Sequence, residues 1–197
     1  MNVLGRAVKR WFDVVVSLCG LIALSPAFLY IYLRLRRQTD DTVIFRQERI
    51  GMGGRPFNIL KFRTMNFDPE PDGVPQLAEK SDQRLTPFCR YLREHHLDEL
   101  PQLWNVLVGD MSFVGPRPER QYFIRQIMQE NPDYQYLYRI RPGVTSMATI
   151  YNGYTDTLEK MLIRLQMDLE YLQHRSLWLD LRIMLTTVRL IGYGKKI

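Results

Sequence analysis

Residues 11–33 read Trp-Phe-Asp-Val-Val-Val-Ser-Leu-Cys-Gly-Leu-Ile-Ala-Leu-Ser-Pro-Ala-Phe-Leu-Tyr-Ile-Tyr-Leu, an apolar stretch whose only formal charge is Asp13. A helix of this length rises about 1.5 Å per residue and is long enough to cross a bilayer core of roughly 30 Å. Basic residues stand on both sides, with Lys9 and Arg10 before the stretch and Arg34, Arg36 and Arg37 after it. Because the two flanks are equally basic, the positive-inside rule gives the stretch no preferred direction across a membrane.

A Ser25-Pro26 pair interrupts this apolar stretch near its middle. Proline lacks the N–H of a helical ladder and displaces the carbonyl four residues before it, so we expect a kink here. Together with the equal flanks, the kink predicts a re-entrant helix with both ends on the cytoplasmic side. We therefore divide the chain into a basic lead-in and re-entrant membrane helix, residues 1–37, and a cytoplasmic-face catalytic domain, residues 38–197. The alternative is an ordinary single span.

The composition favours anionic partners. The chain has 197 residues, a formal net charge of +6 and only two cysteines. Its basic residues are interleaved with aromatic and apolar ones, a pattern typical of binding to lipid head groups or phosphates. We expect no nucleic-acid partner, because zinc-finger spacing, RNP-like sequence and a recognition helix are all absent from the sequence. Two widely spaced cysteines do not form a disulfide framework.

The rest of the chain predicts an α/β fold that is mostly helical, with one small β-hairpin. Strands near residues 43–45 and 57–62 flank Gly51, Gly53, Gly54 and Pro56, and this pattern is typical of a hairpin. The Pro- and Gly-containing stretch 67–82 is expected to be a surface loop. Helical patterns and caps predict the remaining elements: helices over 86–95, 100–107, 119–130, 157–173 and 176–191, and loops over 110–118 and 139–156.

The last of these helices is amphipathic. Its apolar positions are Leu177, Trp178, Leu181, Met184, Leu185 and Val188, and Arg182 and Arg189 stand among them. This pattern is typical of a helix lying in a membrane interface. An ordinary helix facing a protein core would show the same pattern, so both interpretations stay open.

The acidic pair Asp98-Glu99 lies in the segment Leu97-Asp-Glu-Leu-Pro-Gln-Leu103. Asp98 is a suitable N-cap for the helix that follows, and Pro101 is tolerated in its first turn. The positive end of a helix favours the ionised form of both carboxyl groups and can help to hold a phosphate. Taken alone, the pair favours a purely structural cap with a first-turn acid.

Several cationic residues in rigid surroundings give the acidic pair a functional interpretation. Lys61 stands in Lys-Phe-Arg-Thr-Met, Arg93 precedes the pair, Arg117 lies between two prolines, and Arg141 precedes Pro-Gly. Proline and glycine fix the loops around such arginines, which then suit bidentate phosphate binding. The combination indicates a phosphate-handling site at a bilayer. Neither a Walker loop nor a GxGxxG motif is present in the sequence, so an ordinary nucleotide fold is not expected.

The motifs together resemble the bacterial sugar transferases, the monotopic polyprenyl-phosphate phosphoglycosyl transferases. The resemblance covers nearly the whole chain and is closest to the small members that consist of the catalytic domain only. The motifs that carry it are Lys9-Arg-Trp-Phe-Asp13, Ser25-Pro26, Lys61-Phe-Arg-Thr-Met65, Leu97-Asp-Glu-Leu-Pro-Gln-Leu103, Gly109-Asp-Met-Ser-Phe-Val-Gly-Pro-Arg-Pro118 and Arg141-Pro-Gly143.

This resemblance implies an activity. Members transfer a sugar-1-phosphate from a UDP-sugar to undecaprenyl phosphate and release UMP, which begins the assembly of a surface polysaccharide or glycoconjugate. It implies that Asp98 attacks the β-phosphorus and carries a covalent phospho-sugar, that Glu99 acts as the general base, and that Mg²⁺ bridges the diphosphate and Asp98. Phosphoryl transfer depends mainly on positioning and charge neutralisation, which agrees with this residue set.

The same resemblance assigns the surrounding residues and partners. Lys61, Arg93, Arg117, Arg141 and Asp168 match positions near the substrate phosphates. The expected location is the bacterial inner membrane, with the active site facing the cytoplasm and inner-membrane lipids around the helix. Apolar surface near the membrane is compatible with a homodimer. In the loop 144–154, the Gln of many relatives is either replaced by Thr149 or shifted out of register. If this loop reads the sugar or the base, the identity of the sugar does not carry over.

Two further alternatives follow from the resemblance. In the first, the lipid phosphate attacks the donor directly and Asp98 only binds Mg²⁺. In the second, the chain is a non-catalytic membrane adaptor that kept the scaffold, although an intact Asp98-Glu99 pair and arginine set argue against it.

Overall fold

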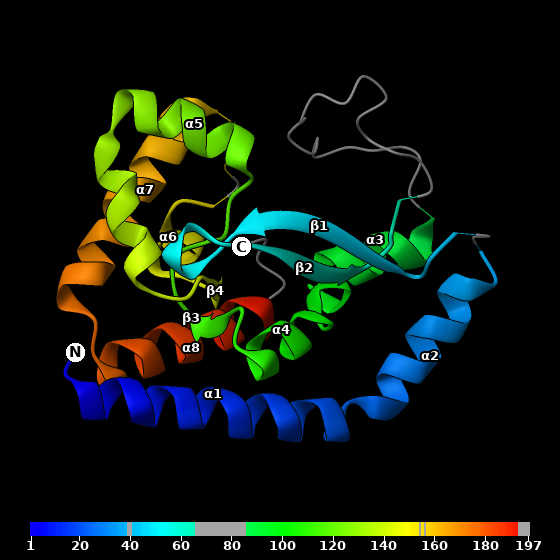
Figure 1. Ribbon diagram of the computed structural model, residues 1–197. Coiled ribbons are helices and arrows are strands. Elements are labelled where there is room, and N and C mark those ends of the chain that lie inside the picture. The colour runs from blue at the N-terminus through cyan, green and yellow to red at the C-terminus, as the bar shows by residue number, and fades with distance from the viewer. Residues whose placement is uncertain (39–40, 66–85, 154, 156, 193–197) are drawn as a thin grey trace.

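The computed structural model describes residues 1–38, 41–65, 86–153, 155 and 157–192 (Figure 1). The stretch 67–82, expected to be a surface loop, lies outside the described residues. The helices and strands form a body that rests on one long N-terminal helix, α1, which runs along its base (Figure 1).

The predicted break at Ser25-Pro26 is confirmed. Helix α1 spans Val3–Ala23, helix α2 spans Ser25–Arg36, and the two are bent by 60°. Pro26 lies in the first turn of α2, where its missing N–H costs least, and the Ser25 hydroxyl donates to the Ile22 carbonyl over 2.8 Å. Neither helix alone is long and apolar enough to cross a membrane; the bent pair, taken together, has the necessary length and composition. The boundary at residue 37 between a membrane part and a catalytic part stays a prediction.

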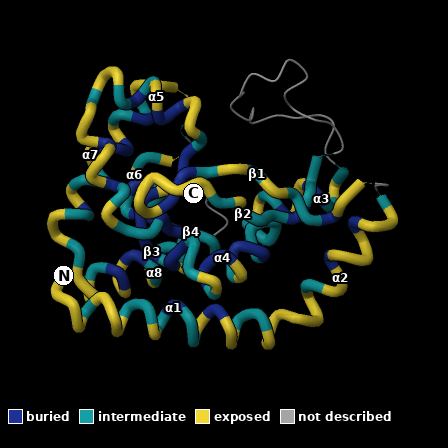
Figure 2. The backbone as a smooth tube through the Cα atoms, viewed as in Figure 1, coloured by how far each residue is buried: buried dark blue, intermediate teal, exposed yellow. Residues whose placement is uncertain are grey.

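The two sides of α1 differ in character. Exposed residues recur along the length of the helix (Figure 2). The large apolar residues among them are Val3, Leu4, Val8, Trp11, Val16, Leu18 and Ile22. The other side buries Asp13 and Ser17 and packs against α4. The apolar stretch is therefore not surrounded by lipid on all sides, because part of its circumference belongs to the protein interior.

The predicted hairpin is confirmed. Strand β1, Ile44–Ile50, pairs antiparallel with β2, Pro56–Phe62, in a register that places Ile44 opposite Phe62. The short 3-10 turn η1, Met52–Gly54, connects them. Gly53 has φ 73°, a left-handed conformation that glycine adopts without steric cost.

The segment that carries the acidic pair begins with the helix α3, Pro87–Glu94, which the Thr86 side chain caps as expected. A 3-10 turn, η2, covers Leu97–Glu99, and helix α4 covers Gln102–Val108. The prediction that Asp98 caps α4 was wrong: the capping position is Pro101, and Asp98 lies in η2. Pro101 has no backbone N–H to donate and stands immediately before the first residue of α4. Asp98 therefore lies about one turn before the start of α4. Gly109 ends α4 as predicted, with φ 99°.

The two predicted loops contain short regular elements that the sequence did not indicate. Strand β3, Ser112–Val114, pairs in parallel with β4, Gly143–Thr145, and helix α6 covers Met147–Tyr151. The two strands are three residues long, which is too short for an alternating pattern to be recognised. Their pairing brings the stretch before Arg117 next to the stretch after Arg141.

The remaining helices complete the body. They are α5, Gln121–Glu130; the 3-10 helix η3, Pro132–Arg139; α7, Leu158–His174; and α8, Leu177–Gly192. A core cluster joins α5, η3 and α7 through Ile124, Leu137 and Leu165. In α8, Leu177, Trp178, Leu181, Leu185 and Val188 are exposed. An exposed apolar face on α8 favours the interfacial interpretation over an ordinary core helix.

Candidate functional site

A strained backbone turn presents the acidic pair. His96 precedes η2 and has φ 54°, the one positive φ at a non-glycine residue in the described part of the chain. Its N–H donates to the Arg93 carbonyl over 3.3 Å, and its carbonyl accepts from the Glu99 N–H over 3.2 Å. Left-handed non-glycine residues cost free energy and gather at functional sites. His96 thus turns the chain from α3 into η2 and sets the direction in which Asp98 and Glu99 leave it.

Glu99 is held by a cation from the hairpin. The Lys61 ammonium on β2 lies 2.6 Å from Glu99 Oε1, and both side chains are largely buried. Burial alone would raise the pKa of Glu99, but Lys61 and Arg117 outweigh it and lower the pKa to about 2. Glu99 is therefore ionised at every physiological pH.

The carboxyl group of Asp98 has the opposite shift. Burial, reinforced by the negative charge of Glu99, raises the pKa of Asp98 to about 6, against the smaller lowering effects of Lys61 and Arg93. The expectation that a helix end would favour ionisation of both groups was wrong for Asp98, because Asp98 is not at the end of α4 and desolvation dominates. The pair is thus divided into one carboxylate that is tightly paired and one that is easily protonated and without an ion pair among the described residues.

A small polar pocket opens beside Glu99. Three cationic side chains line it, Lys61, Arg117 and Arg49, together with uncharged groups: Ile59, Gln102, Pro118, Gly143 and Val144. Arg117 is exposed, and its guanidinium forms no ion pair within the described ranges. Planar guanidinium groups that are not already paired suit phosphate oxygens. The structure thus brings Lys61, Glu99 and Arg117 together, and Arg93 is close enough to Asp98 to lower its pKa.

Asp168 lies behind this pocket rather than in it. The Asp168 side chain on α7 is 2% exposed, and its carboxylate accepts the backbone N–H of Arg117. Its other oxygen, Oδ1, finds no hydrogen-bond partner in the described part of the chain. Burial raises the pKa of Asp168 to about 7. Its geometry suits holding the Arg117 loop, and its predicted place among the substrate-binding residues stays a prediction.

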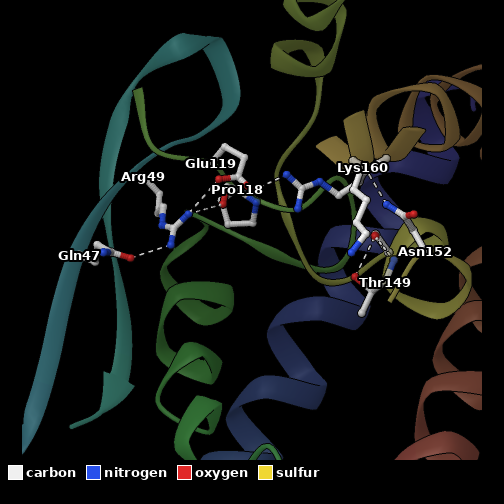
Figure 3. A network of polar contacts seen from close by, with 9 residues as sticks. Gln47, Arg49, Pro118, Glu119, Thr149, Asn152 and Lys160 are labelled. Atoms are coloured by element: carbon white, nitrogen blue, oxygen red, sulfur yellow. Dashed lines mark hydrogen bonds and ion pairs between the residues drawn. The ribbon is translucent and has the colours of Figure 1, made fainter. Parts of the chain in front are cut away.

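A buried ion-pair network supports the same loop. Glu119, two residues after Arg117, contacts Arg164 Nη2 on α7 at 2.5 Å and Arg49 Nη1 on β1 at 3.2 Å. Arg49 also donates to the Pro118 carbonyl and to Gln47 (Figure 3). Sequence reasoning missed Glu119, Arg49 and Arg164, because single charges far apart in the sequence carry no signal of a shared network.

Arg141 takes a different place from the other predicted arginines. Its Nε donates to the Gly109 carbonyl over 2.8 Å, at the end of α4. It does not line the pocket described above. Its predicted contact with the substrate phosphates therefore remains a prediction, whereas its contact with α4 is direct.

The described residues form no group of three or more His, Cys, Asp or Glu side chains that could hold a metal ion by themselves. The Asp98 carboxylate has no ion pair with any residue that the structure describes, and Mg²⁺ in phosphate-transfer sites is commonly held by one or two carboxylates plus substrate phosphates. The donor set therefore fits an ion shared between Asp98 and a bound diphosphate.

The family model described as bacterial sugar transferase matches residues 4–193. The chain belongs to this family. The match includes α1, the hairpin, the acidic pair and the Arg117 loop of the sugar transferase, so the elements that build the site are part of what the family shares.

Three curated relatives are similar over nearly the whole sugar transferase chain. The UDP-glucose:undecaprenyl-phosphate glucose-1-phosphate transferase of Klebsiella pneumoniae is 42% identical over 95% of this chain and 41% of its own length. The UDP-N-acetylgalactosamine-undecaprenyl-phosphate N-acetylgalactosaminephosphotransferase of Aeromonas hydrophila is 37% identical over 96% of this chain and 45% of its own length. The UDP-glucose:undecaprenyl-phosphate glucose-1-phosphate transferase of Caulobacter vibrioides is 42% identical over 91% of this chain and 68% of its own length. The chain thus spans less than half the length of the first two.

Proposed function

We propose that this sugar transferase moves a sugar-1-phosphate from a UDP-sugar to undecaprenyl phosphate and releases UMP, as the first membrane step in assembling a surface polysaccharide or glycoconjugate. The activities for which the relatives are named support the reaction class. The observation that carries the proposal is a pocket lined by Lys61, which is held on Glu99 at 2.6 Å, and by Arg117. Asp98 precedes Glu99 in the chain and has no ion pair among the described residues.

Asp98 is proposed as the nucleophile. Its carboxylate would attack the β-phosphorus of the donor, the bond from that phosphorus to the bridging oxygen would break, and UMP would leave with the electron pair. The covalent aspartyl phospho-sugar would then be attacked by an oxygen of undecaprenyl phosphate, which frees Asp98. Asp98 suits this role better than Glu99, because an oxygen of Glu99 is already bonded to Lys61.

Glu99 and Lys61 are proposed to act together on the acceptor. In the unliganded protein, the Lys61 ammonium lowers the pKa of Glu99. A phosphate bound to Lys61 would compete with Glu99 for that positive charge. The pKa of Glu99 then rises, and the group can accept a proton from the incoming lipid phosphate. Arg93 and Arg117 would stabilise the phosphate oxygens during each transfer.

Mg²⁺ is proposed as the cofactor, with Asp98 as its ligand on the protein. When bound, it would neutralise charge on the donor diphosphate. The cationic groups Lys61 and Arg117 would bind the phosphate oxygens that the ion leaves free.

The proposed location is the bacterial inner membrane, with the enzyme monotopic and its site facing the cytoplasm. The bent pair α1–α2 and the exposed apolar side chains of α1 and α8 support a membrane contact. An enzyme in contact with the membrane surface suits undecaprenyl phosphate as the acceptor, because the long tail of this lipid stays in the hydrocarbon while its phosphate reaches the interface.

A direct test is UMP release from a panel of UDP-sugars with purified protein, Mg²⁺ and undecaprenyl phosphate. Asp98→Asn should abolish release, while Asp133→Asn, the same change at an exposed acid on η3, should leave it intact. Release from one UDP-sugar that requires Asp98 would support the proposal. If the folded protein, supplied with lipid, releases UMP from none of the UDP-sugars, the proposal is contradicted.

A further inference from the structure

One turn of α1 carries three charged residues that contact three separate elements of the body. The first is Lys9, whose ammonium lies 2.7 Å from Asp180 Oδ2 on α8. The other oxygen of Asp180 accepts the Tyr171 hydroxyl of α7 over 2.6 Å. Lys9 therefore ties α1 to a buried polar pair.

Arg10 holds the helix that follows the acidic pair. Its Nη1 donates to the Val106 carbonyl over 2.6 Å and its Nη2 to the Leu107 carbonyl over 2.7 Å. These carbonyls lie in the last turn of α4, which has no intrahelical donors left for them. A guanidinium there also offsets the negative end of the helix. Because α4 begins four residues after Asp98, this contact fixes the wall of the site that carries the carboxylates.

Asp13 holds the opposite wall. It is 2% exposed, and its Oδ1 accepts the backbone N–H of Phe113 on β3 over 3.2 Å. The pairing of β3 continues through the bond from Gly115 N to the Thr145 carbonyl, 3.1 Å, and leads directly into the loop that ends at Arg117. A buried carboxylate is costly in the part of α1 after Arg10, where the other residues carry no charge. The hydrogen bond from Phe113 to Asp13 shows what this buried carboxylate does: it holds β3 against α1.

We propose that Arg10 and Asp13 are positioning residues for the transfer reaction. Arg10 is hydrogen-bonded to α4 and Asp13 to β3, and both residues lie in one turn of α1. These contacts set the separation between Asp98 and the Arg117 loop. The proposal rests on the proposed function for its catalytic consequence. It also gives α1 a second task besides membrane contact: Lys9 and Arg10 are engaged by the protein, whereas Arg6, one turn earlier, is exposed.

The first test is a double-mutant cycle between Asp13 and Arg117. Asp13→Asn should lower kcat/KM for UMP release by about 10- to 100-fold, since displacements of about 1 Å have effects of this size. Membrane retention should not change, because the apolar face is untouched. In an Arg117→Gln background the same change should cost less than about threefold, since the residue through which it acts is gone. Equal losses in both backgrounds would overturn the proposal.

The second test needs no turnover. Hydrogen exchange of the amides of residues 113–115 and 117 should be faster in Asp13→Asn than in the unsubstituted chain, and exchange in α5 should be unchanged. Should Asp13→Asn fail to fold, Arg10→Gln takes its place, with faster exchange expected in the last turn of α4 and with Arg6→Gln as the charge-matched control. Unchanged exchange at these amides would overturn the positioning role. If the unsubstituted chain releases no UMP, the proposed function fails, and exchange still decides whether α1 holds the two walls.

Discussion

The Lys61 ammonium lies 2.6 Å from the carboxylate of Glu99, while Asp98, the preceding residue, has no ion pair among the described residues. Two adjacent carboxyl groups therefore have different environments. The cation lowers the pKa of Glu99 to about 2, and burial raises the pKa of Asp98 to about 6. Pairs whose environments push their pKa values apart are typical of sites that divide two roles between them.

Asp168 should make the stability of the fold depend on pH. Its pKa is about 7 in the folded protein, raised by burial from 3.8, so the folded state binds the proton more tightly than the unfolded state. The stability contributed by the neutral carboxyl is complete below about pH 3.8 and is lost as the pH rises through about 7. Between these values Asp168→Asn should gain stability relative to the unsubstituted chain.

Chemical denaturation of both proteins in detergent micelles, followed by circular dichroism across this pH range, measures the difference. Asn keeps the acceptor for the Arg117 N–H, so the two chains differ mainly in the titrating group. Denaturation midpoints that run parallel with pH would contradict the assignment.

Glu119 should be more important for stability than any exposed acid. It contacts both Arg49 and Arg164, and the side chains of Glu119 and Arg164 are each 7% exposed. Glu119→Gln leaves two buried guanidinium groups without their counter-charge, and breaking a buried pair in this way costs about 3–5 kcal/mol. Glu130→Gln, at an exposed position on α5, serves as the control and should change the free energy of unfolding by less than about 0.5 kcal/mol. Comparable losses in both variants would disprove the network's role.

His96 should tolerate only residues that accept a left-handed backbone. Its φ of 54° is available to Asn but strained for a β-branched residue. His96→Asn is expected to retain most UMP release, while His96→Val should lose about 1–3 kcal/mol of stability and should misdirect Asp98. Thermal unfolding and initial rates of the two variants check this. Similar behaviour of Asn and Val would show that the turn at His96 does not set the direction of the pair.

The sequence predicted the elements whose local chemistry is strong. Ser25-Pro26 predicted the bend, Thr86 the start of α3, and Gly109 the end of α4, and all three are confirmed. These features depend on a few neighbouring residues, so no tertiary contact can easily override them.

What the sequence did not predict depends on contacts between distant residues. Strands β3 and β4 are short and pair only because the body brings them together. Asp98 was expected to cap α4, but Pro101 takes that position. The partners of Glu119 lie on β1 and α7. The ion-pair network of Glu119 could therefore be recognised only from the folded structure. The resemblance placed Lys61 and Arg117 near one site, and the pocket contains both.

The bent pair α1–α2 should return to the side from which it enters. Cysteines placed singly at Arg6 and Arg37, both exposed, in a background of Cys19→Ser and Cys89→Ala, should react from the same side of sealed inverted vesicles with a maleimide that cannot cross the membrane. A kink of 60° makes a return possible where a straight helix would continue across. Labelling of the two positions from opposite sides would establish a single span instead.

The most direct test of the central claim is to look for sugar-phosphate on Asp98 itself. The protein would be mixed with Mg²⁺ and its UDP-sugar, without undecaprenyl phosphate, and its peptides would be analysed by mass spectrometry. The covalent mechanism predicts one equivalent of UMP released per enzyme and a sugar-phosphate mass added to the peptide that contains Asp98, with neither in Asp98→Asn. UMP release that strictly requires the lipid, with no modified peptide at any time, would contradict it and favour direct attack by the lipid phosphate.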